Sequence, residues 1–512
     1  MTEFEATKPK ESSLWVILGA LMLTMFLAAL DQTIVSTALP KIASEFNALN
    51  QLSWVVTAYM LTSAVTTPLY GKLSDLFGRK KMLLIAVGIF LFGSILAGLS
   101  QSMFQLVIFR GIQGIGAGGL MTLVLATIGD VVPMRERGKY QGMFGAVWGL
   151  SSVIGPLLGG YFTDAFSWRW IFYINLPIGI LALVVIWLKL HTKVHHTDHS
   201  IDYLGAMLIS VGSVALLLAA VWGGTTYAWS SPQIIELLVA GIVFAIAFVV
   251  WEHYAKEPIL PPELFRSSIF RVSSLLSLVA GLGMFAAIIY LPEYQQIVRG
   301  FSATKSGLLM LPLVGGMLVA SITSGRMVSK TGKYRIFPII GTIILGFGFY
   351  LLSFISLTIS EWMLGIGMFV TGLGIGCFMQ IMTLAVQNSS DVKHLGAATA
   401  AVTFFRSLGG TFGAAIFGAI LSNRLTTHIQ ELAPGAGTSF GGANLNGGAT
   451  AIRALPPQAQ STILEAFARS FHDMFLYAIP FAVIALIIAL FLKEVPLRHE
   501  TKDMAEGEAF GI

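Results

Sequence analysis

Residues 14–39 read LWVILGALMLTMFLAALDQTIVSTAL, an apolar run that a single acid, Asp31, interrupts. A helix rises about 1.5 Å per residue, so this run is long enough to cross the roughly 30 Å hydrocarbon core of a bilayer. A carboxylate in hydrocarbon costs several kcal/mol unless it has a partner or a function. Asp31 is therefore the first candidate functional residue, and the run around it predicts a membrane-spanning helix.

The composition of the whole chain extends this prediction. The chain has 512 residues, of which 55% are hydrophobic and only 11% are charged, and its mean hydropathy is +0.79. These values exclude a water-soluble globule of this size. Apolar runs of more than about 18 residues indicate spanning helices rather than the shorter alternating strands of a membrane barrel. The chain is therefore predicted to be an all-α integral membrane protein, whose 54 glycines let helices approach one another closely.

The same sequence argues against several other classes of function. The net charge of +5 is spread over short loops and forms no basic arm, so nucleic acid is not expected as a partner. The single cysteine, Cys377, supplies neither a disulfide framework nor a thiolate metal site. No Walker A sequence, HExxH motif or nucleophile elbow occurs, so we expect neither an ATP-driven machine nor an enzyme. The histidine-rich residues 191–199 favour a solvated loop, so no metal is predicted.

Apolar runs separated by charged or Gly/Pro/Asn-rich stretches predict fourteen membrane spans. The first six cover residues 14–39, 52–70, 82–100, 104–128, 140–163 and 168–188. Two more cover 203–222 and 232–252, and the last six cover 270–292, 304–325, 336–357, 362–386, 395–421 and 471–492. An even number of spans places both termini on one side. The apolar run behind residues 1–13 is too long for a cleaved signal, so the first span is expected to be retained.

Lysine and arginine in the loops set the expected orientation, because cytoplasmic loops carry an excess of both. A cytoplasmic N-terminus places the larger set of these residues inside: Lys72, Arg79, Lys80, Lys81, Arg135, Arg137, Lys139, Lys189, Lys193, Lys256, Arg266, Arg271, Arg326, Lys330, Lys333, Arg335, Lys393, Lys493, Arg498 and Lys502. The outer face then keeps Lys41, Arg169, Arg299, Arg424, Arg453 and Arg469. We therefore expect a protein of the cytoplasmic membrane whose N- and C-termini are both cytoplasmic.

Two loops and two spans repeat within the chain. Residues 71–81 read GKLSDLFGRKK and residues 325–335 read GRMVSKTGKYR, with two glycines at the same spacing. The glycines of the fourth span likewise recur in the twelfth, as Gly114, Gly116 and Gly118 and as Gly372, Gly374 and Gly376. Such repetition predicts two parallel six-helix halves, separated by two inserted helices. The expected domains are an N-terminal bundle, the inserted helices and a C-terminal bundle, over residues 1–190, 191–268 and 269–512.

The longest connector between spans, residues 422–470, is expected outside the membrane. Its glycine-rich residues 434–437 and 441–448 have a loop-forming composition. Apolar residues near its end recur at helical spacing and predict an amphipathic helix at the outer surface: Ile463, Ala466, Phe467 and Phe471. The segment is either a lid or an inert connector, and we favour a connector.

Two opposite charges are predicted to lie at similar depth inside the membrane. Asp31 is about 7 Å beyond the midpoint of the first span, and Arg110 is about 9 Å to the outer side of the midpoint of the fourth. An ion pair, either direct or bridged by Gln113, would make both charges tolerable. The alternative is a permanent salt bridge that locks the two spans together. We favour a functional pair because buried ionisable residues usually mark ion pathways.

The expected function of Asp31 is proton coupling. The protonation of a carboxylate responds to its hydration and to a neighbouring guanidinium, so a change in either loads or releases a proton. A cationic or polarisable substrate in the same cavity competes with the proton for the carboxylate. That competition couples the two movements without a direct contact between substrate and proton.

Other residues are predicted to line the cavity. Trp54 and Tyr59 are candidates, although aromatic belts and ordinary packing are commoner uses of such residues. Arg406 lies deep in a span, and a substrate role is weighed equally against snorkelling or pairing with helix carbonyls. Together with Gln113 and the acid of the first span, these are the predicted substrate-binding residues. Glu293, near the outer end of a span, is expected at the membrane interface.

Small residues and inner-face charges predict the moving parts. The fifth span carries small residues around a proline, a pattern that indicates either tight packing or a hinge and seal: Gly142, Ser151, Gly155, Pro156, Gly159 and Gly160. On the inner face, Asp75 either caps a helix or holds a gate shut. Arg79 and Asp130 are expected to form a second pair in the same latch.

These residues together resemble the major facilitator superfamily, and within it the fourteen-span drug:proton antiporter family. The resemblance covers nearly the whole chain and rests on motifs in residues 30–40 (LDQTIVSTALP), 71–81, 110–114 (RGIQG), 142–160 and 168–177 (WRWIFYINLP). Each motif alone is degenerate, whereas all of them in order are specific. Two positions depart from the family pattern, since Ser36 replaces a common Asn and Ser151 a common Gly. Both substitutes are small, so the packing should survive.

The resemblance implies that Arg110 takes part in proton coupling and that Asp75 and Arg79 form a conformational latch. We therefore expect a monomeric antiporter without a cofactor, driven by the proton gradient, that exports amphipathic, lipophilic or cationic drugs by alternating access. Because the tenth and thirteenth spans carry no acid, a preference for dications and a multi-proton stoichiometry are not expected. The alternatives are an exporter of an endogenous siderophore, lipid or amino acid, and a membrane sensor that binds a ligand without transporting it.

Overall fold

Helices account for nearly all of the regular structure. The computed structural model describes residues 11–46, 48, 52–132, 134–190, 201–224, 226–433, 452 and 455–497. The helices are α1 (Glu11–Glu45), α2 (Leu52–Phe77), α3 (Arg79–Gly98), α4 (Met103–Val131), α5 (Met134–Ala165), α6 (Trp170–Tyr173), α7 (Asn175–Lys189), α8 (Tyr203–Trp222), α9 (Pro232–Glu252), α10 (Pro262–Arg266), α11 (Ser268–Ile297), α12 (Ala303–Leu309), α13 (Leu311–Thr331), α14 (Ile336–Leu352), α15 (Glu361–Ser389), η2 (Val392–His394), α16 (Leu395–Leu432) and α19 (Pro457–Leu490). In these described ranges, the β-type pairing is one isolated bridge between Gly223 and Tyr227.

The described residues contain 12 helical segments that are long and apolar enough to cross a membrane. α14 is also apolar but has only 17 residues, and α2 is not among the 12. Large apolar side chains point outward from several of these segments, for example Phe92, Trp187 and Val249. Such a surface is favourable only against lipid, so the chain is a multi-pass membrane protein.

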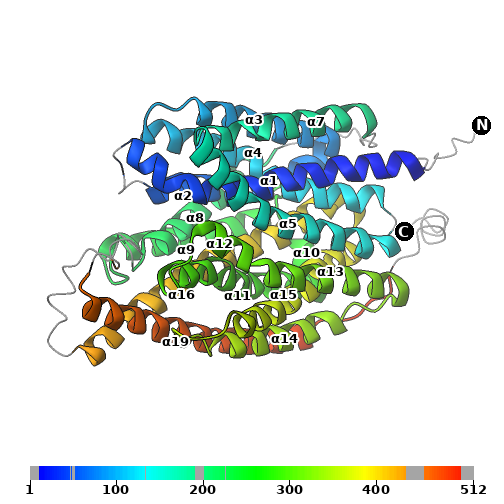
Figure 1. Cartoon of the computed structure of the whole chain (residues 1–512). Helices are drawn as coiled ribbons and strands as arrows, with labels where there is room; N and C mark the ends of the chain where they lie inside the picture. The colour runs from blue at the N-terminus through cyan, green and yellow to red at the C-terminus, as the bar shows by residue number, and fades with distance from the viewer. Residues whose placement is uncertain are drawn as a thin grey trace, which may run out of the picture.

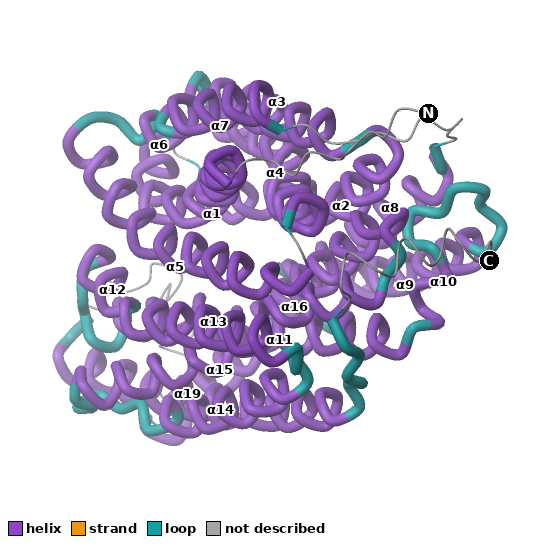
Figure 2. Tube along the Cα trace, turned by 90° about the vertical axis from the view of Figure 1, so that its right-hand side faces the viewer, coloured by secondary structure: helices purple, strands orange, loops and turns teal. Residues whose placement is uncertain are grey.

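The helices form two groups with one packing pattern, drawn one above the other in Figure 1. In the group from α1 to α7, α4 packs against both α2 and α3. In the group from α11 to α19, α15 packs in the same way against α13 and α14. The groups meet where α5 packs against α13, near the centre of Figure 2, and where α2 packs against α16. The end at which α1 begins, on the right in Figure 1, is called the near end, and the opposite one the far end.

The two repeated loops share one backbone feature. Gly78, which precedes α3, and Gly332, which follows α13, both adopt positive φ values, of 88° and 72°. A residue with a Cβ atom rarely adopts this conformation, so glycine suits the reversal of the chain between helices. This shared geometry explains why the second glycine of each repeated loop recurs.

α8 and α9 pack against each other, and α8 also contacts α2 and α16. At the near end, Asp202 Oδ1 accepts hydrogen bonds from the Gly205 N–H and from Trp251 Nε1, each at 2.8 Å. This shared acceptor ties the start of α8 to the end of α9. Lys72 Nζ lies 2.6 Å from Glu257 Oε2 and links α2 to the connector that follows α9.

The outer connector expected over residues 422–470 is shorter than predicted. α16 continues to Leu432 and α19 begins at Pro457, so helices occupy both ends of it. The prediction of an amphipathic helix at the outer surface is wrong. Its apolar residues are buried on α19, which continues through the last span: Ile463, Ala466, Phe467 and Phe471. The glycine-rich part of the connector lies outside the described residues, as do Lys193, Arg453, Arg498, Lys502 and the histidine-rich tract.

Candidate functional site

Asp31 and Arg110 form a buried ion pair between α1 and α4. Arg110 Nη1 lies 2.5 Å from Asp31 Oδ2, and the two side chains are 2% and 0% exposed, respectively. The structure thus brings together the two charges that the sequence places at similar depth. Removal of either partner would leave the other charge buried without compensation.

Amide and hydroxyl groups complete the site around Asp31. Gln113 Nε2 and Asn175 Nδ2 donate to Asp31 Oδ1 at 2.8 and 3.0 Å. The same two amides donate to Ser94 Oγ at 2.6 and 3.0 Å. Sequence reasoning found Gln113 but missed Ser94 on α3 and Asn175 on α7. A polar asparagine inside an apolar span was the signal that could have found Asn175. These four residues and Arg110 are called the Asp31 network.

The Arg110 guanidinium has further contacts on its other sides. Nη1 donates to Gln113 Oε1 at 2.7 Å, and Nε donates to the Val55 carbonyl at 3.4 Å. The guanidinium carbon lies 4.1 Å from the centroid of the Tyr59 ring and 5.8 Å from that of Phe172. A buried charge pair is tolerable when hydrogen bonds and aromatic faces satisfy its remaining donors, and these contacts do so.

Two adjoining hollows lie where the two groups of helices meet. Their volumes are about 620 Å³ and about 80 Å³, and together they are called the central cavity. Both hollows are lined by Gln32, Met60, Trp148 and Phe285. The larger volume suits a drug-sized molecule, and its mostly apolar lining suits an amphipathic one. Methionine in the lining adapts to ligands of different shape.

Only two of the predicted substrate-binding residues line the central cavity. They are Tyr59 and Arg406, both in the wall of the smaller hollow. Asp31 and Gln113 line neither hollow, since both are fully buried inside the group from α1 to α7. Trp54 also lies elsewhere, with its ring edge-on to Trp222 of α8 and the centroids 5.5 Å apart. The geometry therefore gives no support to direct competition between substrate and proton at the Asp31 carboxylate.

The two charged residues in the cavity wall come from different helices. Arg406, on α16, is 8% exposed, so its side chain does not snorkel to the surface. Glu293, on α11, lines the larger hollow. α11 continues through Pro292 to Ile297, so Glu293 lies close to the end of this helix, and its position at the membrane interface stays a prediction.

At the near end, Asp75 joins the two groups of helices. Its two carboxylate oxygens accept hydrogen bonds from the backbone N–H groups of Gly396 and Ala397, at 2.9 and 2.8 Å. These residues begin α16, where the helix dipole favours a negative charge. Arg79 lies 2.6 Å from Asp75 and 2.8 Å from Asp130, so both predicted pairs form. A Cβ atom at Gly396 would overlap the Arg79 side chain, so this close approach requires glycine.

α5 packs against both α1 and α13 and carries the residues predicted as a hinge. The Ser151 carbonyl accepts a hydrogen bond from Thr33 Oγ1 of α1 at 3.0 Å. Gly155 approaches Thr33 so closely that a Cβ atom would overlap the hydroxyl. Pro156 lines the larger hollow. The other predicted hinge residues lie on the same helix: Gly142, Gly159 and Gly160.

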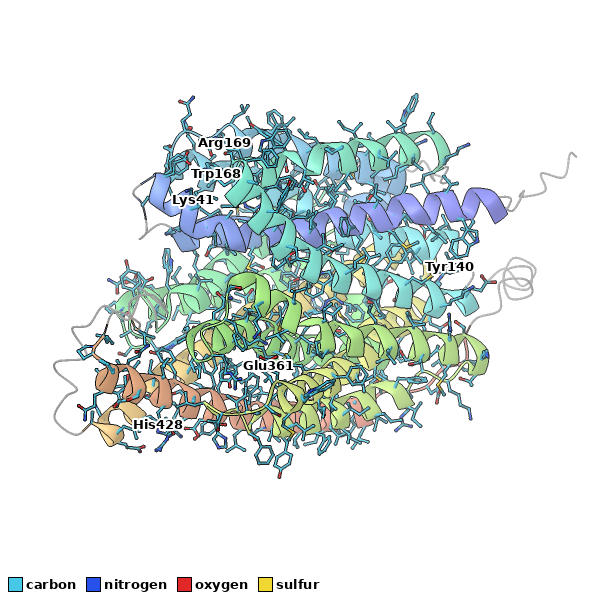
Figure 3. The ribbon with its side chains drawn as sticks, viewed as in Figure 1. Lys41, Tyr140, Trp168, Arg169, Glu361 and His428 are labelled. Atoms are coloured by element: carbon cyan, nitrogen blue, oxygen red, sulfur yellow. The ribbon has the colours of Figure 1, made fainter. Side chains whose placement is uncertain are left out.

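The far end has polar contacts of its own, and Figure 3 shows Trp168 and Arg169 close to Lys41 there. Glu45 accepts a hydrogen bond from Trp168 Nε1 at 2.8 Å and pairs with Arg169 at 2.9 Å. In the part of the chain that the structure describes, no three histidine, cysteine or acidic side chains gather as a metal site would require.

The fold and these sites define a class, a helical membrane protein with a ligand-sized cavity between two repeated groups of helices. The model of the Major Facilitator Superfamily matches residues 21–414. The chain belongs to this family, and it is a transporter of small molecules.

The similar proteins include transporters of bacteria. The chain is 42% identical to an uncharacterized MFS-type transporter of Mycobacterium tuberculosis, over 97% of this chain and 72% of that protein. It is 37% identical to the multidrug transporter protein MdtP of Bacillus subtilis, over 98% of this chain and 97% of that one. Multidrug resistance protein 3 of the same organism is 36% identical, over 95% and 96%. A solved structure of a double tryptophan mutant of XylE covers 98% of this chain and 99% of its own, with a TM-score of 0.62 at 15% identity, which shows the fold alone.

Proposed function

We propose that the chain is a proton-coupled antiporter that exports amphipathic, lipophilic or cationic drugs or toxic compounds by alternating access. The observation that carries the proposal is the Asp31 network, a buried acid and guanidinium beside a mostly apolar cavity. Ionisable groups in this position commonly belong to proton pathways. Two relatives named for multidrug transport or resistance support export of drug-like molecules. The proton gradient supplies the free energy, so no cofactor is required.

Proton binding at Asp31 would change what holds α1 in place. The charged carboxylate is held by Arg110, whereas a protonated one loses the ionic part of that contact. Arg110 would keep its contacts with Gln113, the Val55 carbonyl and the Tyr59 ring. α1 is then bound less firmly to α4. Because Asp31 is fully buried, it exchanges protons with water only in another conformation, as alternating access requires.

A chain of direct contacts leads from Asp31 to the cavity wall. Two residues further along α1, Thr33 donates to Ser151 of α5, and α5 packs against α13 of the other group. Ser152 and Pro156 of α5 line the larger hollow. Movement of α1 would therefore move the cavity wall, with the small residues of α5 as hinge and seal. This coupling through packed helices takes the place of direct competition at the carboxylate.

The proposed topology has fourteen spans, the twelve apolar segments together with α2 and α14. Both termini are placed in the cytoplasm, and the protein acts as a monomer in the cytoplasmic membrane. Its domains are the bundles over residues 1–190 and 269–512, with the inserted helices over 191–268. The near end is then cytoplasmic, and the contacts of Asp75, Arg79 and Asp130 form a latch that holds it closed while the cavity opens outward.

The test is substrate-driven proton flux in proteoliposomes, with ethidium as the amphipathic cation and an internal pH dye as the reporter. Asp31→Asn is expected to reduce the flux roughly tenfold or more, which corresponds to about 1.4 kcal/mol in the activation free energy of transport. Exchange of labelled for unlabelled ethidium should continue, because Asp31 does not line the cavity. Glu45→Gln is the matched control, since Glu45 is an acid on the same helix that pairs with Arg169 at the far end.

Normal proton flux in Asp31→Asn would overturn the assignment of the acid. Binding of ethidium without flux under any gradient would support the sensor. Proton-driven flux of a siderophore, lipid or amino acid, but not of ethidium, would support an exporter of an endogenous product.

A further inference from the structure

The central cavity contains one charged side chain in the wall of each hollow. Among the side chains that the structure describes, Glu293 is the only charged residue lining the larger hollow, and Arg406 is the only one lining the smaller. Across the described parts of the chain, neither side chain has a hydrogen-bond or ion-pair partner. Asp31 and Arg110 differ in this respect, because each is the partner of the other. The cavity therefore holds an acid and a guanidinium that the protein itself leaves uncompensated.

A charge held in apolar surroundings without a counter-charge is unfavourable, and a ligand of opposite charge relieves that cost. Arg406 is almost fully buried, and the wall around Glu293 includes Ile289, Pro292 and Ile297. A cationic ligand would compensate only the acid, and an anionic ligand only the guanidinium. A ligand with both charges compensates both residues at once.

The helix geometry sets the length of such a ligand. Gly281 of α11 packs against the backbone carbonyl of Arg406, so these two positions lie at the same level. From Gly281 to Glu293, α11 rises about 18 Å at about 1.5 Å per residue. Both side chains are long and can shorten this separation. The residues shared by the two hollows, including Met60, Trp148 and Phe285, provide an apolar surface between the charges.

We propose that the preferred substrates are zwitterionic amphiphiles, in which a cationic group pairs with Glu293 and an anionic group pairs with Arg406. An apolar, preferably aromatic, body fills the space between them and contacts Trp148 and Phe285. This inference rests on the proposed transport function and names the substrate class of its cavity. It makes Glu293 and Arg406 the residues that determine specificity, separately from the Asp31 network.

A series of three related dyes tests the charge requirement. The free acid of a rhodamine carries both charges, its methyl ester carries only the cation, and fluorescein carries only anionic charge. Binding to the full chain in detergent is measured by fluorescence anisotropy at constant pH. The wild-type protein is expected to bind the free acid at least about tenfold more tightly than either relative, because only this dye makes both ion pairs.

Two variants assign the charges to their residues. Glu293→Gln should weaken binding of the free acid and of the ester by about tenfold while leaving fluorescein unchanged. Arg406→Gln should weaken binding of the free acid and of fluorescein by a similar factor while leaving the ester unchanged. Retained binding of the unaffected dye shows that each variant is folded. Glu361→Gln and Arg469→Gln are controls, since both residues are exposed and pair at the surface.

Equal affinity of the wild-type protein for all three dyes would overturn the inference, as would variants that weaken all dyes alike. Dye uptake into proteoliposomes under a pH gradient separates this result from the proposed function. Charge-selective binding without proton-driven uptake would contradict antiport and leave the substrate class standing. Proton-driven uptake without charge-selective binding would contradict only the substrate class.

Discussion

The two groups of helices share one packing pattern but differ in what lies inside it. When the glycines of α4 and α15 are aligned, Met368 occupies the position of Arg110. Where Arg110 meets Asp31 in one group, Met368 Sδ meets Gln295 Nε2 of α11 in the other, at 3.8 Å. The same scaffold therefore exists with a charged contact and with a neutral one. The comparison indicates that this packing does not require charges, which favours the proposed functional role of Asp31 and Arg110.

The loops at the near end differ in the same way. Asp75 and Arg79 of one group correspond to Ser329 and Lys333 of the other. Asp75 reaches across to the start of α16, whereas Lys333 is exposed to solvent. Of the two repeated loops, only the one at residues 71–81 therefore provides an acid that binds the backbone of the other group of helices.

The largest change in stability is expected when the neutral contact between Met368 and Gln295 is copied into the place of the Arg110–Asp31 ion pair. Arg110→Met alone leaves Asp31 buried without its counter-charge, which should destabilise the fold by about 3–5 kcal/mol. Adding Asp31→Gln recreates the pair formed by Gln295 and Met368. The double variant should recover most of the stability but show no proton flux. Thermal unfolding in detergent and flux in proteoliposomes measure the two outcomes. An Arg110→Met variant as stable as the wild-type protein would contradict this interpretation of the two contacts. A double variant with normal proton flux would contradict it as well.

A smaller effect is expected from the helix contact that links the Asp31 network to α5. Gly155→Ala places a methyl group against Thr33, so either α1 or α5 must shift. Overpacking of this kind costs about 2 kcal/mol and should slow transport more than it weakens binding. Gly315→Ala on α13 is the control, because nothing lies within 4 Å of its added Cβ atom. Equal transport rates in both variants would argue against the role of α5.

Loss of the charge on Asp75 in the latch should change the free-energy difference between the closed and open near end by about 1.4 kcal/mol. Asp75→Asn weakens the charge-assisted hydrogen bonds to α16. It should shift the conformational equilibrium about tenfold toward a state in which the two groups of helices are separated at the near end. Spin labels at positions 81 and 393, in a Cys377→Ser background, report the distance between the groups. Lys333→Gln changes the matching loop of the other group and should leave the distance distribution unchanged. An unchanged distribution in Asp75→Asn would exclude the latch.

The smallest effect concerns His394, at the start of α16. Burial, followed by the nearby charges of Lys393 and Lys72, lowers its pKa from the usual 6.5. The folded state therefore binds fewer protons than the unfolded state below pH 6.5, and stability falls as the pH decreases through this value. The loss should be less than about 1 kcal/mol, since the side chain is partly exposed. His394→Gln should flatten this part of the profile of unfolding temperature against pH; an unaltered slope would refute the assignment.

The charged part of the Asp31 network could be predicted because an acid and a guanidinium stand out in apolar spans, and helix rise gives their depth. Ser94 and Asn175 could not be predicted in the same way. Small polar side chains are common in membrane helices, and the sequence does not say which neighbours they face.

The errors also have physical causes. The ninth span is predicted over residues 270–292, whereas α11 continues past Pro292 to Ile297 among neighbouring helices that support it. The residues around Phe467 show one apolar face, and that pattern is the same whether the face meets lipid headgroups or protein. Only the course of α19 distinguishes the two cases.

Tyr59 touches the Arg110 guanidinium and also lines the smaller hollow, so it stands between the ligand space and the acid. In the proposed mechanism, recognition of the substrate and use of the proton gradient thus depend on different atoms. Variants selected for growth on a new toxic compound should alter wall residues such as Met60 or Phe285 and keep the same number of protons moved per molecule expelled.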